Sequence, residues 1–159
     1  LSLSAQSIVN KVTDLEILLI THSPHVVVLT ETWLNNAIME NCILPPGYKI
    51  FQWDRDTRGG GVAVIIKNNV AATTVHCQLP ETVWCKVNYA NHTHLIGAVY
   101  RPPGSPPEFL EELNMFVCDH VNENTRLIMA GDFISRIYFA HIFRAFQVVM
   151  LKPVVLIGY

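Results

Sequence analysis

The sequence has few charged residues and no excess of either sign. Charged side chains make up only 15% of the 159 residues, whereas an average soluble domain carries about 25%. Half of the residues are hydrophobic, which excludes a disordered or low-complexity chain, and the length favours one domain with its own core. The net charge of −2 provides no overall basic field, so any binding of nucleic acid must come from a local site.

The signals of a secreted or membrane-spanning chain are also missing. The first residues lack the basic and apolar regions of a signal peptide, and no run of eighteen uncharged apolar residues occurs. The four cysteines form no C-x-x-C pair, so we expect reduced, buried thiols in an intracellular, reducing compartment. These cysteines are Cys42, Cys77, Cys85 and Cys118. The chain does not begin with Met, which is typical of a fragment of a longer protein.

Two segments have the apolar periodicity of helices. Residues Ser7–His22 place apolar side chains at helical spacing and end before Pro24, a residue that disfavours helical geometry just before it. A second helix is predicted over Pro107–Asn122, with an apolar stripe and acidic residues in its early turns. The first helix leads directly into an apolar run, His25–Thr30, which is typical of a buried strand. This succession indicates an α/β fold.

Further strands follow at meander-like spacing, separated by glycine, proline and asparagine pairs. They are predicted at Tyr48–Trp53, Gly61–Lys67, Val70–Gln78, Thr82–Asn88 and Thr93–Tyr100. Asn68-Asn69 is predicted to form a tight hairpin between two of them. Another buried strand, Leu127–Ala130, follows the second helix. Acidic residues disappear after Ile134, so we expect residues 134–159 to be a divergent tail that packs poorly, with a helix over Phe139–Val149 as the alternative.

Two acidic residues directly follow buried strands. Glu31 comes after the first predicted strand and Asp132 after the last. Ligands collect at the carboxyl ends of strands in α/β sheets, so these two acids would face one another if their strands were parallel neighbours. Paired carboxylates suit Mg²⁺. Spacing alone favours the alternative, in which each acid merely caps the next turn.

A glycine run and three tryptophans have two interpretations each. Gly59-Gly60-Gly61 has backbone amides that could cradle a phosphate, but a turn before a strand explains the run equally well. The tryptophans are more typical of packing than of a platform on which bases stack. They are Trp33, Trp53 and Trp84.

Four short motifs in order resemble the endonuclease/exonuclease/phosphatase superfamily, and more closely the endonuclease domain of non-LTR retrotransposon polyproteins. They are Thr30-Glu31-Thr32-Trp33-Leu34, Gly59–Val64, Val99-Tyr100-Arg101-Pro102-Pro103 and Ala130-Gly131-Asp132-Phe133. The resemblance implies part of a four-layer α/β sandwich over residues 1–133, incomplete at its C-terminus, in which two packed mixed sheets are flanked by helices. It also implies DNA cleavage with Mg²⁺ or Mn²⁺, a nuclear location, and a reverse transcriptase farther along the full polyprotein.

The resemblance assigns roles to individual residues. Glu31 matches the metal-binding glutamate, and Asp132 the aspartate that orients the attacking water or the phosphate. Tyr100 matches a tyrosine beside the scissile phosphate, where a phenol can donate a hydrogen bond. Arg101 would contact phosphate, although an ordinary surface role is the alternative.

The sequence departs from the family pattern at three places. Ser4 and Ile134 each stand where the family has an asparagine, and isoleucine cannot form a side-chain hydrogen bond. The family's terminal S-D-H histidine has no counterpart, since His141 lies too early. The sequence therefore predicts a retrotransposon-type DNA endonuclease domain with impaired activity. The alternatives are a non-catalytic, degenerate transposon fragment and a phosphatase of the same superfamily.

Overall fold

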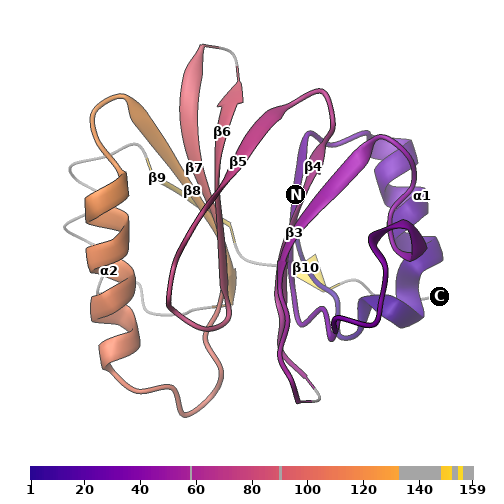
Figure 1. Cartoon of the computed structure of the whole chain (residues 1–159), viewed down its shortest axis with the longest axis horizontal. Coiled ribbons are helices and arrows are strands. Elements are labelled where there is room, and N and C mark those ends of the chain that lie inside the picture. Colours follow the sequence, from indigo (N-terminus) through magenta and orange to yellow (C-terminus); the bar gives the residue numbers. More distant parts are fainter. Residues whose placement is uncertain (58, 90, 133–147, 152–153, 156–159) are drawn as a thin grey trace.

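Two β-sheets packed face to face form the centre of the molecule, and one helix lies on the outer face of each (Figure 1). This computed structural model describes residues 1–57, 59–89, 91–132, 148–151 and 154–155. Helix α1 (Val12–His22) covers one sheet and helix α2 (Glu108–His120) covers the other. The arrangement confirms the predicted α/β fold with two mixed sheets flanked by helices.

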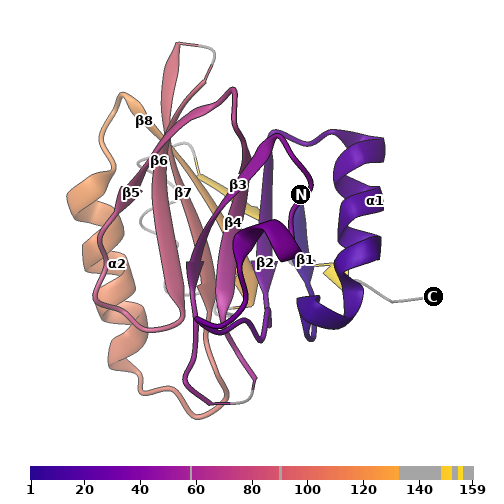
Figure 2. The ribbon, with the colours of Figure 1, turned by 45° about the vertical axis from the view of Figure 1, so that its right-hand side comes forward.

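The sheet beneath α1 contains five strands in the order β10-β1-β2-β4-β3. These strands are β1 (Ser2–Ser4), β2 (Val26–Thr30), β3 (Tyr48–Trp53), β4 (Val62–Lys67) and β10 (Val154–Val155). Strands β10, β1 and β2 run parallel, whereas β4 is antiparallel to both β2 and β3. The sheet is therefore mixed, and Figure 2 shows it from a second side.

The sheet beneath α2 also contains five strands, in the order β5-β6-β7-β8-β9. They are β5 (Ala71–Val75), β6 (Thr82–Tyr89), β7 (His92–Tyr100), β8 (Thr125–Asp132) and β9 (Val148–Leu151). The first three form an antiparallel meander, and β7, β8 and β9 are parallel. Helix α2 makes the crossover between β7 and β8, as parallel strands require.

Side chains alternate between the two faces of each strand and thereby fill three separate cores. On β2, for example, Val27 and Leu29 pack toward α1, whereas Val28 packs between the sheets. On β8, Leu127 packs toward α2 and Ala130 toward the other sheet. Strands buried on both faces appear as nearly continuous apolar runs, which explains why the sequence revealed them so clearly.

The predicted helices hold, with small differences at their ends. The segment predicted as Ser7–His22 divides into a 3₁₀ turn, η1 (Ile8–Lys11), followed by α1. Strand β1 and the short 3₁₀ turn η2 (Glu40–Cys42) were not predicted from the sequence. No helix within the described residues is long and apolar enough to cross a membrane.

The predicted hairpin at Asn68-Asn69 is wrong. This turn joins β4 to β5, and these two strands belong to different sheets. The chain crosses between the sheets here, and each strand pairs with another neighbour: β4 with β2 and β3, and β5 with β6. Turn residues alone report that the chain changes direction, not which strands then pair.

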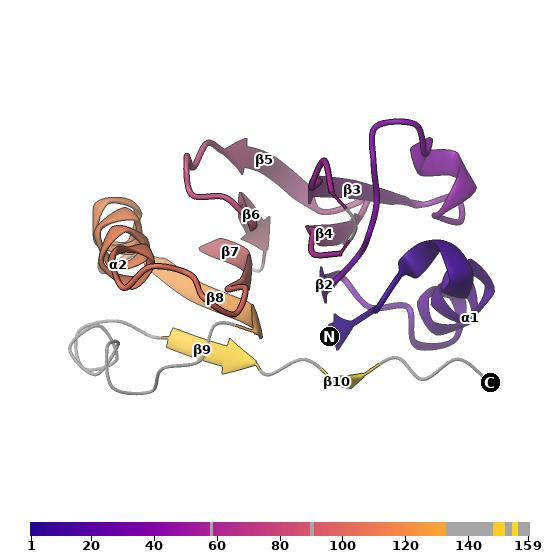
Figure 3. The same cartoon turned by 90° about the horizontal axis from the view of Figure 1, so that it is seen from below.

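Two short segments of the predicted tail form strands. Strand β9 pairs with β8 and strand β10 pairs with β1, so the chain adds a parallel edge strand to each sheet (Figure 3). Whether residues 134–159 pack poorly stays a prediction, because most of this segment lies outside the described residues. The alternative helix over Phe139–Val149 lies mostly outside the described residues, and its last two residues belong to β9.

The prediction of four buried thiols is also only partly right. All four cysteines are free, but only Cys85 is buried, between the two sheets. Cys42 and Cys118 are exposed, and Cys77 is half-buried. Burial raises the pKa of Cys85 to about 12.

Replacing Gly97 with alanine should destabilise the fold. An added Cβ would lie 2.3 Å from Cζ3 of Trp84, whose side chain is fully buried under α2. Overpacking of this kind costs about 1–3 kcal/mol. Urea unfolding would measure the loss, which should shrink in a Trp84→Leu background. An equal loss in both backgrounds would contradict the proposed clash.

The cysteines should differ in reactivity. At pH 8, iodoacetamide should modify Cys42 and Cys118 readily, because the thiolate is the reactive form and both side chains are exposed. Cys85 should react only after unfolding, since its pKa of about 12 leaves almost no thiolate and its side chain is buried. Mass spectrometry of the labelled peptides, with and without urea, checks this. Early modification of Cys85 in the folded protein would contradict its position.

Candidate active site

Glu31, Tyr100 and Asp132 meet at one edge of the sandwich, although their strands belong to two sheets. Tyr100 ends β7 and Asp132 ends β8, and these residues are paired in the parallel register. Glu31 follows β2 in the other sheet, and the Tyr100 hydroxyl donates a hydrogen bond to its carboxylate. The strands before Glu31 and Asp132 are thus not neighbours in one sheet, as the simplest hypothesis required. Their carboxyl ends converge across the interface between the sheets.

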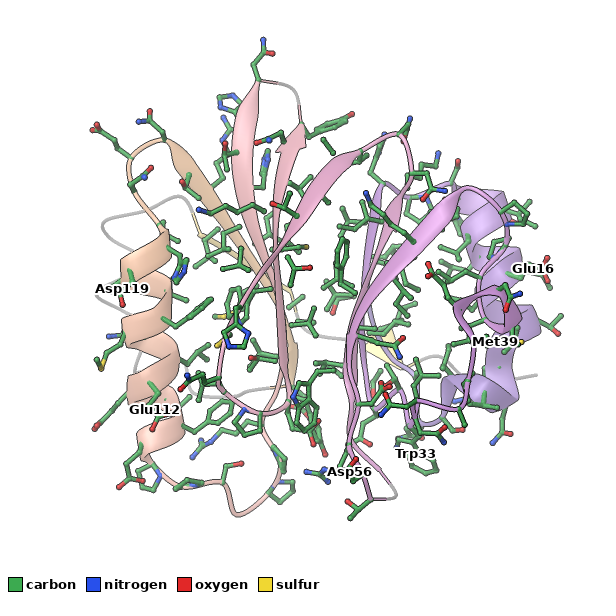
Figure 4. All side chains as sticks on the ribbon, viewed as in Figure 1. Glu16, Trp33, Met39, Asp56, Glu112 and Asp119 are labelled. Carbon is green, nitrogen blue, oxygen red and sulfur yellow. The ribbon has the colours of Figure 1, made fainter. Side chains whose placement is uncertain are left out.

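The Glu31 carboxylate is held by three donors. Its Oε2 accepts from the indole N–H of Trp33 at 2.7 Å and from the backbone N–H of Gly60 at 3.0 Å. Tyr100 is the third donor. Burial alone would raise the pKa of Glu31, but these hydrogen bonds and the charge of Arg55 outweigh it and lower the pKa. The carboxylate is therefore ionised at neutral pH. Figure 4 shows Trp33 at this edge of the molecule.

Tyr100 is a neutral hydrogen-bond donor in this arrangement. Burial and the adjacent Glu31 carboxylate raise the pKa of Tyr100 well above the usual range of a phenol. The hydroxyl therefore keeps its proton at physiological pH. In the structure this proton goes to Glu31 and not to an incoming oxyanion, so a role beside a phosphate requires the hydroxyl to exchange partners.

The glycine run does not cradle a phosphate; its amides bind two carboxylates. The N–H of Gly60 donates to Glu31, and the N–H of the next residue, Gly61, donates to Oε2 of Glu81 at 2.7 Å. Both glycines have positive φ, of 72° and 81°. A Cβ on Gly60 would lie 2.6 Å from Oε1 of Glu81, so the turn needs glycine for space as well as for conformation.

Glu81 is a buried acid that links the two sheets. It directly precedes β6, yet it binds Gly61 at the start of β4, and its own carbonyl accepts the N–H of Tyr100 at 3.0 Å. Its Oε1 lies 2.6 Å from Nε of Arg55. Burial raises the pKa of Glu81, and the nearby charge of Glu31 adds to this, while the Gly61 hydrogen bond and Arg55 oppose it.

Arg101 is engaged within its own loop. Its Nη2 donates to the Ser105 carbonyl at 3.3 Å, and its backbone N–H donates to the Asp132 carbonyl at 2.7 Å. Its Nε is buried without a hydrogen-bond partner in the described part of the chain. The loop lines a cavity of about 350 Å³ together with Tyr100 and Asp132. This cavity is the concave space next to the site.

Of the two positions that depart from the family pattern, the structure describes only one. Ser4 lies on β1 beside Thr30 of β2, one residue from Glu31 in register, and it is half-buried. A serine side chain is shorter than the asparagine that the family carries there. Ile134 lies outside the described residues.

The site fits a hydrated Mg²⁺ better than a metal ion surrounded by protein ligands. Among residues 1–132, apart from Arg58 and Ala90, and the two tail strands, no three His, Cys, Asp or Glu side chains gather as a metal cluster. The ionised carboxylate of Glu31 has oxygen lone pairs that its hydrogen bonds do not use, so these can bind a cation. Mg²⁺ commonly binds through one or two carboxylates and keeps several waters. The donor set is compatible with such an ion, and Glu31 is the residue that could hold it.

Sequence reasoning did not identify Glu81, Arg55 or the role of Trp33. Glu81 follows Leu79-Pro80 in a segment that the sequence marks as a break between strands. Its importance arises from contacts with Arg55 and Gly61, which are distant in sequence and in the other sheet. No local pattern reports such a contact. The one signal in the sequence was the segment of residues 54–61, in which acidic residues, arginines and glycines lie close together.

A model of the endonuclease/exonuclease/phosphatase family matches residues 4–133 of the chain. No curated protein sequence matches. Among solved structures, the chain is similar to the endonuclease domain of TRAS1, a telomere-specific non-LTR retrotransposon, with 13% identity and a TM-score of 0.57. The match covers 79% of this chain and 56% of that one.

Two further structures are similar. An AP endonuclease from Archaeoglobus fulgidus has 17% identity and a TM-score of 0.57, with 82% of this chain and 55% of that chain covered. A 3′ phosphatase from Neisseria, bound to a product DNA hairpin, has 16% identity and a TM-score of 0.61, covering 83% and 56%. At this level of identity the similarity shows the fold. The chain spans a little over half the length of these structures.

Alanine at Gly60 should be more harmful than alanine at Gly59. Both positions have positive φ, which costs an alanine about 1–2 kcal/mol. Only at Gly60 would the Cβ also press on the Glu81 carboxylate, which adds roughly 1–3 kcal/mol; at Gly59 the nearest atom is 4.0 Å away. Urea unfolding of both variants measures the difference. Equal destabilisation would show that the turn tolerates a side chain beside Glu81.

Proposed function

The chain belongs to the endonuclease/exonuclease/phosphatase family, and from this premise we propose that it carries part of a metal-dependent DNA endonuclease of the retrotransposon type. The observation that carries the proposal is the convergence of Glu31, Tyr100 and Asp132 at one edge of the sandwich, beside a cavity. The similar structures include an endonuclease of a retrotransposon and an enzyme bound to DNA, which supports DNA as the substrate.

In this proposal Glu31 would hold Mg²⁺ or Mn²⁺ through its ionised carboxylate. When bound, the cation would neutralise charge on the scissile phosphate and favour attack by water. Tyr100, which is neutral, would exchange Glu31 for a phosphate oxygen as the acceptor of its hydrogen bond. Asp132, exposed at the end of β8 and lining the cavity, would orient the attacking water or the phosphate. A reverse transcriptase as partner stays a prediction.

We further propose that this chain cleaves DNA weakly. Ser4 pairs with Thr30, the residue before Glu31, and has a short hydroxyl where the resemblance expects the longer amide of asparagine, so one polar contact of the site would be lost. Ile134 would remove a second one. A single well-placed donor is commonly worth a hundredfold or more in rate, and the losses need not add.

The test is nicking of supercoiled plasmid with Mg²⁺. The parent chain should convert a small fraction to open circles, and Glu31→Gln should lower the rate on the order of a hundredfold. Glu16→Gln is the matched control, because Glu16 lies exposed on α1, far from the site (Figure 4). A variant with Ser4→Asn and Ile134→Asn should nick faster than the parent.

The outcomes separate the candidate functions. Nicking that survives Glu31→Gln would overturn the assigned site. Absence of nicking in both the parent and the Ser4→Asn, Ile134→Asn variant would overturn the catalytic proposal and favour the non-catalytic fragment. Release of phosphate from a 3′-phosphorylated oligonucleotide without nicking would favour the phosphatase.

A further inference from the structure

Arg55 is an anchored cation at the edge of the site. It follows β3, and its Nε forms the ion pair with Glu81 described above. The Glu81 side chain is 3% exposed, whereas that of Arg55 is 33% exposed. The guanidinium is therefore held through its Nε, and its two terminal nitrogens form no hydrogen bond or ion pair with the described residues.

The charge of Arg55 reaches the residues of the proposed active site. It lowers the pKa of Glu31 and acts in the same direction on Tyr100, although burial and Glu31 raise the pKa of Tyr100 overall. Arg55 also lines a cavity of about 320 Å³ that includes Pro102 and Ser105. The same two residues line the cavity of Tyr100 and Asp132. The loop that contains Pro102 and Ser105 thus separates Arg55 from the proposed catalytic residues.

The side chain of Arg101 is less available to bind a ligand. One of its nitrogens donates to Ser105, and its Nε is buried. Releasing the side chain toward a ligand would break a contact within the loop that shapes the cavity. Arg55 needs no such change, because Glu81 contacts only its Nε and the side chain is partly exposed.

We propose that Arg55, not Arg101, supplies the guanidinium that binds a phosphate group of the DNA, and that Glu81 is the positioning residue for Arg55. This inference rests on the proposed function. The two terminal nitrogens of a guanidinium match two phosphate oxygens, and a side chain that is already fixed loses little freedom on binding. Glu81 also holds the turn that orients Glu31, so one buried acid aligns both the carboxylate and the cation of the site.

The first test is the salt dependence of DNA binding, which needs no catalysis. Anisotropy of a fluorescein-labelled DNA duplex, titrated in EDTA at several KCl concentrations, gives the slope of log K against log salt. Loss of one phosphate contact lowers this slope by about 1, so Arg55→Gln should show that decrease. Arg55→Lys keeps the charge and should retain most of the slope. Arg101→Gln should retain the parent slope.

Lys86→Gln is the charge-matched control, since it removes one positive charge from an exposed position on β6. Thermal melting of each variant confirms folding before its slope is compared. A parent slope in folded Arg55→Gln, or a larger decrease in Arg101→Gln, would overturn the assignment of Arg55. Absence of DNA binding by the parent chain would instead overturn the proposed function, and this inference with it.

The role of Glu81 is tested by a double-mutant cycle with the same readout. Glu81→Gln should weaken DNA binding while Arg55 is intact and should have little further effect in Arg55→Gln, because the pair acts as a unit. A purely structural Glu81 would lower the melting temperature and weaken binding by the same factor in both backgrounds. That additive result would overturn Glu81 as a positioning residue.

Discussion

Two consecutive backbone amides, those of Gly60 and Gly61, hold the functional edge of this molecule together. One amide binds Glu31, which follows β2, and the next binds Glu81, which precedes β6 in the other sheet. Because Tyr100 then joins β7 to Glu31, the two sheets are connected by hydrogen bonds at the very point where the candidate active site lies. Elsewhere the described interface between the sheets is mainly apolar contact, which fixes distance but not the direction of a carboxylate.

The layers of the fold could be predicted because burial leaves a periodic trace in the sequence. Strands such as β2 and β4 are covered on both faces, and their apolar runs were recognised with errors of a residue or so at the ends. The order of the strands within the sheets leaves no such periodic pattern in the sequence. The turn at Asn68-Asn69 resembles a hairpin locally, yet it carries the chain from one sheet to the other. Which strands pair is decided by contacts between distant segments.

The same division applies to the site. Glu31 and Asp132 were singled out because each follows a buried strand, but their roles came from the family resemblance. The structure brings both to one edge together with Tyr100. Glu81 and Arg55 were missed because their meaning comes from each other and from Gly61. A lone acid after a proline is ordinary in a loop; only when folding buries it does it require partners, because an uncompensated buried charge costs several kcal/mol. Burial of this kind is a property of the fold, not of the neighbouring residues.

Backbone strain is concentrated at this edge, and its location is informative. Glu31, Trp33 and Glu81 all have positive φ, a conformation that side chains other than glycine rarely adopt. Each such residue costs about 1–3 kcal/mol and persists only where the surroundings fix it. Here the three apolar cores set the positions of the strands, and the hydrogen bonds to Gly60 and Gly61 hold the strained residues at the strand ends. The carboxylate that accepts the Tyr100 hydrogen bond belongs to one of these strained residues, so the strain lies at the residue that joins the two sheets.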